Sequence, residues 1–297
     1  MPKTRASEDN NLDMPIRPRT LSREWSKIML MLPLLLFLAT FFVYPMLGLF
    51  LRSVSAENGS LTLDHYSQIF STPIYLRLFW NTFQIAFIVT FLTLLIGYGF
   101  AYYMSVARPS IAGILMFCTL LPFFTSILVR TYGWMIILGP EGLLNQLLIQ
   151  IGLSPRQLMY NRVGVLIGMV YALFPYMVLT LYSVFSGIDK KLMRAASNLG
   201  ANPVQAFVFV FWPLSLPGVA GGCLLVFILA LGYFVTPSLM GGGGDQMIAM
   251  LIFENIDRSL NWEFAAALST ILLILTLFCL LIFSRLVGLQ SLLESRR

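Results

Sequence analysis

Long apolar runs separated by shorter polar stretches recur along the chain. Each run is longer than the roughly 20 residues that a helix needs to cross the hydrocarbon core of a bilayer. The runs cover residues 28–51, 80–106, 111–138, 164–186, 214–240 and 262–286. The pattern predicts an all-α membrane protein with six transmembrane helices, an N-terminal tail over 1–27 and a C-terminal tail over 287–297.

The first apolar run follows a basic flank, so a cleaved signal peptide is the alternative to a retained helix. The run exceeds the apolar core of about 7–15 residues that signal peptides carry, which favours a retained helix. Between the runs, the sequence also predicts short helices over 61–70 and 143–151.

Composition supports a membrane location. Hydrophobic residues make up 58% of the chain and charged residues 11%, against about 25% charged residues in a typical soluble domain. So little polar sequence leaves no room for a separate nucleotide-binding domain. Cys118, Cys223 and Cys279 all lie inside apolar runs, so they indicate neither a disulfide framework nor a metal site.

Basic residues concentrate on one side of the predicted membrane. With the N-terminus placed inside, about two thirds of the 19 Lys and Arg residues fall on the inner side. This bias predicts that both termini are cytoplasmic. It also accounts for the net charge of +6 without a nucleic-acid partner.

The inner loop over 187–213 has the signals of two short helices joined by a sharp turn. Asp189 is suited to cap the first helix, and Gly200 is suited to end it in a left-handed conformation. Asn202 and Pro203 are suited to be the cap and the first residue of the second helix.

The first of these helices carries a narrow apolar stripe. Its members recur at helical spacing and are Leu192, Ala195, Ala196 and Leu199. The two adjacent alanines favour close approach of another protein, although an ordinary interfacial helix is the alternative that these residues leave open.

The same loop resembles the signature of binding-protein-dependent ATP-binding-cassette importer permeases, which is Glu-Ala-Ala, three residues, Gly, nine residues, Ile-x-Leu-Pro. The matching positions are Ala195, Ala196, Gly200, Val210, Trp212 and Pro213. The sequence departs from the signature at Arg194, which replaces the glutamate, and at Asn198, where an acidic residue is common in the family.

The resemblance implies a bundle like that of type I importer permeases, in which this loop is the coupling helix that docks on an ATPase. The implied contact residues are Arg194, Ala195, Ala196, Asn198, Leu199, Gly200 and Pro213. It further implies a chain that is not an enzyme and binds no cofactor, because a separate ATPase dimer holds the ATP and magnesium. The other implied partners are a homologous permease, forming a heterodimer, and an extracytoplasmic binding protein, all at a bacterial inner membrane.

Further segments resemble the B-type subunit of the spermidine/putrescine permease subfamily. They cover residues 121–126, 129–134, 139–145, 167–171, 173–178 and 241–243. The resemblance implies a polyamine or another small organic cation as cargo. The subfamily also serves thiamine, iron, opine and phosphonate uptake, and these solutes remain alternatives.

Aromatic residues provide candidates for a translocation path, because Tyr and Trp rings attract cations. The candidates are Tyr132, Trp134, Phe174, Tyr176, Tyr182 and Phe234. Packing within the bundle and belts at the membrane interface are the alternative roles for such residues.

Acidic residues gather near the last outer loop. Asp245, Glu254 and Asp257, with Glu263 nearby, are candidates to receive basic residues of a binding protein, or else form a solvated face. His65 is the sole histidine, which argues against a metal site.

A self-sufficient secondary carrier is the functional alternative. Such a carrier would be expected to show ionisable residues within its spans. The apolar runs carry none near their centres, and Arg130 lies near one end of its run. The sequence therefore favours a permease subunit driven by a separate ATPase.

Overall fold

The structure is a computed structural model that describes residues 31–56 and 60–294, with side chains as far as Arg285. The predicted tail over 1–27 and the start of the first span lie outside these residues. The chain divides after Leu49 into two units, which are described separately. In the first unit, an apolar helix begins at Met31 and contains a π-helical turn over Ala39–Val43 before α2 (Tyr44–Ser53).

Within the described residues, five helices are long and apolar enough to cross a membrane, and a strongly bent helix pair provides a sixth candidate. This agrees with the predicted all-α membrane fold. After the first helix, the unbroken candidates comprise α4 (Pro73–Val106), α8 (Arg162–Phe185), a helix over Pro203–Leu231 that includes α11 (Trp212–Leu231), and α14 (Trp262–Glu294). The helix α14 extends into the predicted C-terminal tail.

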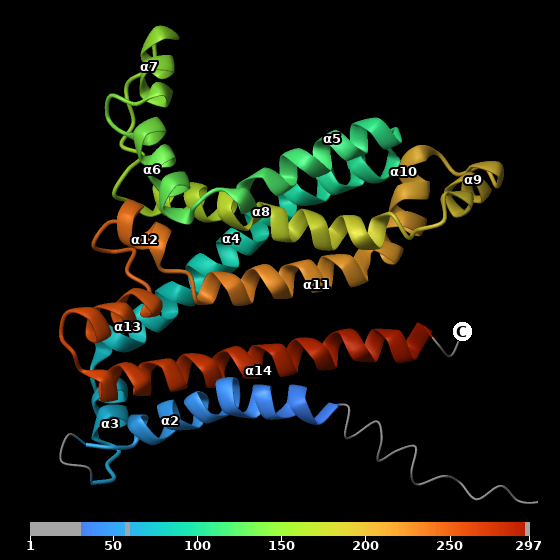
Figure 1. Ribbon diagram of the computed structural model, residues 1–297. Helices are drawn as coiled ribbons and strands as arrows, with labels where there is room; N and C mark the ends of the chain where they lie inside the picture. Colours follow the sequence, from blue (N-terminus) through green and yellow to red (C-terminus); the bar gives the residue numbers. More distant parts are fainter. Residues whose placement is uncertain (1–30, 57–59, 295–297) are drawn as a thin grey trace, which may run out of the picture. The chain divides into compact units, whose positions relative to one another are not determined.

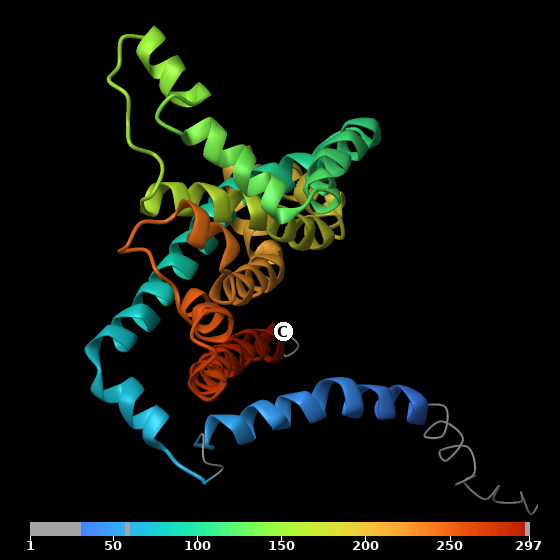
Figure 2. The same cartoon turned by 60° about the vertical axis from the view of Figure 1, so that its left-hand side comes forward.

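The main core lies where α4, α8 and α11 pack together (Figure 1; Figure 2). Fully buried side chains from all three helices meet there, among them Ile85, Met169, Leu181 and Val226. A second cluster joins the start of α4 to α3 (Asp64–Ser71), α13 (Ile248–Asp257) and α14. The short helices α3 and α7 (Leu143–Gln150) confirm two sequence predictions.

Small residues let α8 and α11 approach closely. A Cβ atom added at Gly218 would lie 2.9 Å from Cβ of Val184, whereas one at Gly221 would lie 3.6 Å from the nearest atom, Cγ2 of Thr180. Association of membrane helices depends on such close packing, because lipid supplies no hydrophobic drive between helices.

We therefore expect Gly218→Ala to lower the melting temperature of the detergent-solubilised protein by several degrees, because the added methyl group must displace Val184. The matched variant Gly221→Ala adds the same methyl group at an ordinary contact distance. Thermal unfolding of both variants by intrinsic fluorescence provides the measurement. Equal melting temperatures would contradict the packing argument.

The third predicted span, over 111–138, is not one straight helix. Its first part is α5 (Pro109–Leu120), which tightens into a 3₁₀ turn over Leu121–Phe124. The chain is then extended at Thr125, and α6 (Ile127–Leu138) begins in a new direction. The segments Pro109–Phe124 and Ile127–Gln150, the second of which also includes α7, differ in direction by 102°. Pro122 contributes to this break, because proline lacks the N–H that continues a helix and clashes with the preceding turn.

The fifth predicted span, over 214–240, is shifted in the structure. A continuous helix begins at Pro203 and ends at Leu231, and α12 (Val235–Met240) follows after a break. A π-helical turn over Phe207–Phe211 precedes Pro213. This wider turn removes the need for a hydrogen bond that Pro213 is unable to donate, so the helix passes through the proline.

Candidate functional site

The loop between α8 and α11 forms two helices joined by a sharp turn, which we call the elbow (residues 187–206). The first helix is α9 (Lys190–Asn198). Asp189 caps it, since its side-chain Oδ1 accepts a hydrogen bond of 2.8 Å from the Lys191 backbone N–H. The structure confirms the predicted cap.

Gly200 ends α9 in the left-handed conformation, with φ of 88°. Two backbone hydrogen bonds close the turn: Gly200 N–H donates to the Ser197 carbonyl, and Ala201 N–H donates to the Ala196 carbonyl, both at 3.0 Å. This pair of bonds is the Schellman motif, in which the residue after the helix adopts positive φ. Glycine is favoured there because any Cβ is strained in this conformation.

The second helix of the elbow, α10 (Pro203–Ala206), begins with a reciprocal cap. Asn202 Oδ1 accepts a hydrogen bond of 2.8 Å from Gln205 N–H, and Asn202 N–H donates one of 2.9 Å to Gln205 Oε1. With Pro203 at the first position of α10, both ends of the turn are fixed by local interactions.

The elbow is exposed, although it is anchored to the bundle. No residue of α9 is buried, and the Leu199 side chain at its end is 89% exposed. Met193 and Phe207 pack against the main core and hold the elbow in place. Leu199 shares one face of α9 with the exposed Leu192 and Ala195, and an exposed apolar patch of this kind marks a candidate contact surface for another protein.

The predicted coupling residues divide between this exposed surface and the helix that follows. Arg194, Ala195, Asn198, Leu199 and Gly200 are exposed, and Ala196 is half-buried. Pro213 lies instead in the first turn of α11, beyond the elbow. Arg194 has no acidic neighbour within ion-pair distance among the described residues.

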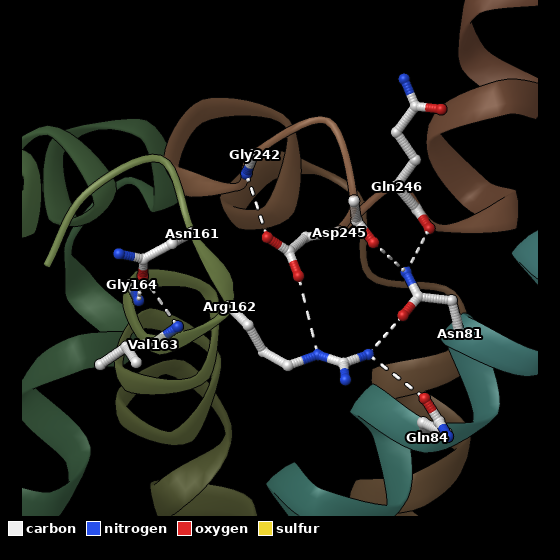
Figure 3. Close-up of polar contacts among 10 residues, drawn as sticks. Asn81, Gln84, Asn161, Arg162, Val163, Gly164, Gly242, Asp245 and Gln246 are labelled. Atoms are coloured by element: carbon white, nitrogen blue, oxygen red, sulfur yellow. Dashed lines mark hydrogen bonds and ion pairs between the residues drawn. The ribbon is translucent and has the colours of Figure 1, made fainter. Parts of the chain in front are cut away.

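A polar cluster lies at the other end of α8, where Asn161 caps the helix by accepting hydrogen bonds from Val163 and Gly164 N–H groups at 2.9 and 3.1 Å (Figure 3). Arg162, the first residue of α8, extends toward α4 and donates hydrogen bonds to Asn81 Oδ1 and, at 3.4 Å, to Gln84 Oε1.

The loop before α13 completes this cluster. Asp245 Oδ1 lies 3.6 Å from Arg162 Nε, an ion-pair distance that is too long for a hydrogen bond. The other carboxylate oxygen accepts a hydrogen bond of 3.2 Å from Gly242 N–H. Asn81 Nδ2 donates to the backbone carbonyls of Gly244 and Gln246 at 3.2 and 2.8 Å. The cluster ties α4, α8 and the 241–247 loop together (Figure 3).

Asp245 therefore differs from the three other acidic residues that the sequence singled out. Its side chain is only 11% exposed and is engaged with Arg162, so it has little surface to offer a binding protein. Glu254 and Asp257 are exposed on α13, where Glu254 lies 3.8 Å from Arg258 on the same helix. Glu263 is half-buried at the start of α14.

Sequence reasoning missed Arg162 and Asn81 as partners of Asp245. Asn81 lies more than 160 residues before the carbonyls that it contacts. The available signals were an amide at the second position of an apolar run and an arginine immediately after a capping residue. Neither signal indicates which distant residue Asn81 or Arg162 contacts in the folded chain.

The six aromatic candidates do not form one cluster in this conformation. No ring contact joins any two of them within the described residues. Phe174 packs on Phe100, and Phe234 stacks on Phe253. Tyr182 lies against the main core, and Tyr132 is exposed on α6. Tyr176 packs on Phe123, next to the break between α5 and α6, and Trp134 packs on Tyr171.

These apolar spans define a multi-pass membrane protein, and its family follows from comparison with known proteins. Residues 93–292 match the family described as "Binding-protein-dependent transport system inner membrane component". The chain belongs to this family of transport proteins. It is thus a permease subunit of an importer and a multi-pass inner-membrane protein, and its family is not one of enzymes.

Two relatives are permeases named for spermidine and putrescine transport. The Haemophilus influenzae protein PotB is 39% identical over 223 residues, which cover 73% of this chain and 78% of that protein. The Escherichia coli K12 protein PotB is 34% identical over 263 residues, covering 88% and 93% respectively. The sequence-based assignment to this group of importer permeases is therefore confirmed.

The fold also matches a solved transporter. A chain of a bacterial ABC transporter that imports the acidic polysaccharide alginate superposes with a TM-score of 0.68 at 19% identity, covering 89% of this chain and 96% of that chain. A second crystal structure of a bacterial alginate transporter, in complex with an alginate pentasaccharide-bound periplasmic protein, matches with the same TM-score at 18% identity. At these identities, the likeness supports the fold alone.

Proposed function

We propose that the elbow is the surface through which a cytoplasmic ATPase drives this permease. The observation that carries the proposal is the exposed Leu199 at the tip of α9, held by the glycine-dependent turn at Gly200. Hydrogen bonds fix the turn on both sides of the tip. A force applied to the tip therefore moves α10 and α11 instead of deforming the turn. The elbow thereby couples closure of the ATPase dimer to movement of the bundle.

The transport cycle that follows is alternating access. ATP and magnesium bind to the ATPase subunits, and this chain holds neither. Binding of ATP favours one arrangement of the bundle and hydrolysis restores the other, so the passage opens to one side at a time. A homologous permease supplies the second half of the passage, in a heterodimer.

The orientation of the chain follows from the same proposal. If the elbow faces an ATPase, it lies in the cytoplasm, and the Arg162–Asp245 cluster at the other end of α8 lies on the outer side. The basic bias predicted from the sequence gives the same orientation, with both termini in the cytoplasm. Glu254 and Asp257 would then be exposed where an extracytoplasmic binding protein docks.

We propose a polyamine as the cargo. Support comes from relatives named for spermidine and putrescine transport that align over most of the chain. The abundance of aromatic side chains, 14% of the residues, also suits passage of an organic cation, which tyrosine and tryptophan faces attract weakly. Weak attraction favours transport, because the cargo must also leave.

Competition for uptake tests the choice of cargo. The permease pair, ATPase and cognate binding protein are reconstituted in vesicles, and uptake of radiolabelled spermidine is measured. Unlabelled spermidine and putrescine in large excess are expected to reduce the labelled uptake about tenfold or more by occupying the same sites. Thiamine and 2-aminoethylphosphonate serve as controls and should have no effect. Absence of ATP-dependent uptake of labelled spermidine, with uptake of a labelled control solute instead, would replace the polyamine assignment but keep the importer class.

A further inference from the structure

A group of aromatic rings lies where the elbow joins the bundle. Phe207 and Phe211 belong to the π-helical turn that follows the elbow, and their rings stack with centroids 5.6 Å apart. The other rings come from the helices of the main core: Tyr98 and Tyr102 from α4, Phe185 from the end of α8, and Trp212 from the start of α11. We call these rings the aromatic cluster. It is the largest connected group of rings in the described part of the chain.

Through Tyr102, α4 contacts the chain where it leaves the elbow. The Tyr102 ring meets the rings of Phe207 and Phe211 edge-on, with centroids 5.4 and 4.8 Å apart. Edge-to-face contact is a favourable geometry, because the positive edge of one ring faces the negative face of the other. Phe207 directly follows the elbow, so these contacts join α4 to its end.

Through Tyr98, α4 also contacts the chain beyond the π-helical turn. The Tyr98 hydroxyl lies 2.9 Å from Oγ of Ser215, which is buried on α11. Ser215 Oγ donates its own hydrogen to the Trp212 carbonyl at 2.8 Å, so the Tyr98 hydroxyl is the donor to Ser215. Such a bond is electrostatically stronger in apolar surroundings than in water. It therefore fixes α4 to the first turns of α11.

The π-helical turn is the weakest part of the connection between the elbow and α11. Its closing hydrogen bond runs from Trp212 N–H to the Phe207 carbonyl, one residue further than in an α-helix. Pro213 follows and has no N–H to donate. A force from the elbow is partly lost in an irregular turn unless side chains brace it. The contacts of α4 with residues on both sides of the turn provide that brace.

We propose that the aromatic cluster makes α4 move together with the elbow and α11, so that closure of the ATPase reaches two helices of the main core at once. Tyr98 and Tyr102 are then positioning residues, which act by fixing α4 to the moving segment. The inference rests on the proposed function of the elbow and adds how its movement enters the bundle. Without these contacts, a movement of the elbow toward α11 would have to cross the irregular turn unsupported.

The amount of spermidine taken up per ATP hydrolysed, which we call the coupling ratio, tests this proposal in vesicles that hold the complete complex. Tyr102→Leu keeps an apolar side chain but removes the ring that meets Phe207 and Phe211. We expect the coupling ratio to fall about fivefold, because contacts along a coupled path carry part of the coupling free energy. ATP hydrolysis should continue, because the exposed surface of the elbow is unchanged.

Two control variants separate coupling from stability. Tyr102→Phe keeps the ring and should keep the coupling ratio. Phe83→Leu removes a different ring contact of α4, with Phe227 on α11 at 6.0 Å, far along α4 from the elbow. Both leucine variants lose ring packing, so their melting temperatures should fall by similar amounts, but only Tyr102→Leu should lower the coupling ratio. An equal fall of the ratio in both would mean that the aromatic cluster only stabilises the fold, and would overturn the proposal.

Tyr98→Phe tests the brace without disturbing the packing of the rings. It keeps every ring of the aromatic cluster and removes only the hydrogen bond to Ser215. The coupling ratio should fall about twofold. Ser215→Ala, which removes the acceptor, should have the same effect. Unchanged ratios in both variants would contradict the connection between α4 and α11.

The outcomes also separate this proposal from the proposed function. A normal coupling ratio in Tyr102→Leu, together with a lowered ratio in Gly200→Val, would overturn the role of the aromatic cluster and leave the elbow as the coupling surface. Normal uptake by Gly200→Val would contradict the proposed function itself. The double variant should have a ratio no lower than that of Gly200→Val alone, because both changes interrupt one path. A reduction equal to the product of the two separate reductions would contradict transmission from the elbow through the cluster.

Discussion

The variant Gly200→Val is expected to reduce ATP-driven uptake about tenfold while the protein remains in the membrane. Gly200 has φ of 88°, and a Cβ at this position would have no atom within 4 Å. The effect of the substitution therefore comes from the backbone alone. A β-branched residue in this conformation costs about 1–3 kcal/mol, enough to unwind the end of α9 and displace Leu199.

Two further variants isolate the cause of this loss. Gly200→Asn should retain most uptake, because asparagine tolerates the left-handed conformation better than valine. Gly243→Val removes another glycine with open space around it, and without positive φ, so it should also transport. Uptake and binding-protein-stimulated ATPase activity are measured in the same vesicles. Normal uptake by Gly200→Val would count decisively against the elbow as the coupling surface.

The second large effect is expected from Arg162→Met. This change leaves Asp245 nearly buried without its cation and removes a donor from Asn81. Removing one partner of a buried ion pair costs about 3–5 kcal/mol. Because the Arg162 side chain is 38% exposed, water compensates part of that loss, and we expect about 2 kcal/mol. Thermal unfolding in detergent should show a melting temperature lower by several degrees.

The exposed pair Arg258–Glu254 provides the control for this prediction. Its side chains are 78% and 51% exposed, so Arg258→Met should leave the melting temperature unchanged. In the double variant Arg162→Met with Asp245→Asn, the uncompensated charge disappears and part of the lost stability should return. If Arg162→Met and Arg258→Met behave alike, the polar cluster does not hold the 241–247 loop.

The elbow was predicted in detail from the sequence because its geometry depends on local interactions. The caps of Asp189 and Asn202 and the positive φ of Gly200 each involve residues no more than a few positions apart. Residue type alone nearly determines such turns. The existence of the long apolar helices was predictable for a similar reason, since each helix satisfies its own backbone hydrogen bonds.

The interactions between distant segments were not predictable in this way. The span over 111–138 contains Pro122, but α8 and α11 contain Pro175 and Pro217 and continue through them. What separates a tolerated proline from a break is the packing around it, which a single sequence does not contain. The contacts of Arg162 with Asn81 and Asp245 likewise join three segments that the sequence places far apart.

The helix α11 has a mechanical consequence. Its 20 residues make a rod about 30 Å long, which follows the elbow and the π-helical turn at one end and stops at the break before α12 at the other. A stiff rod of this length acts as a lever, so a displacement at one membrane face arrives at the other without an intermediate relay. One helix therefore coordinates the movements at the two membrane faces.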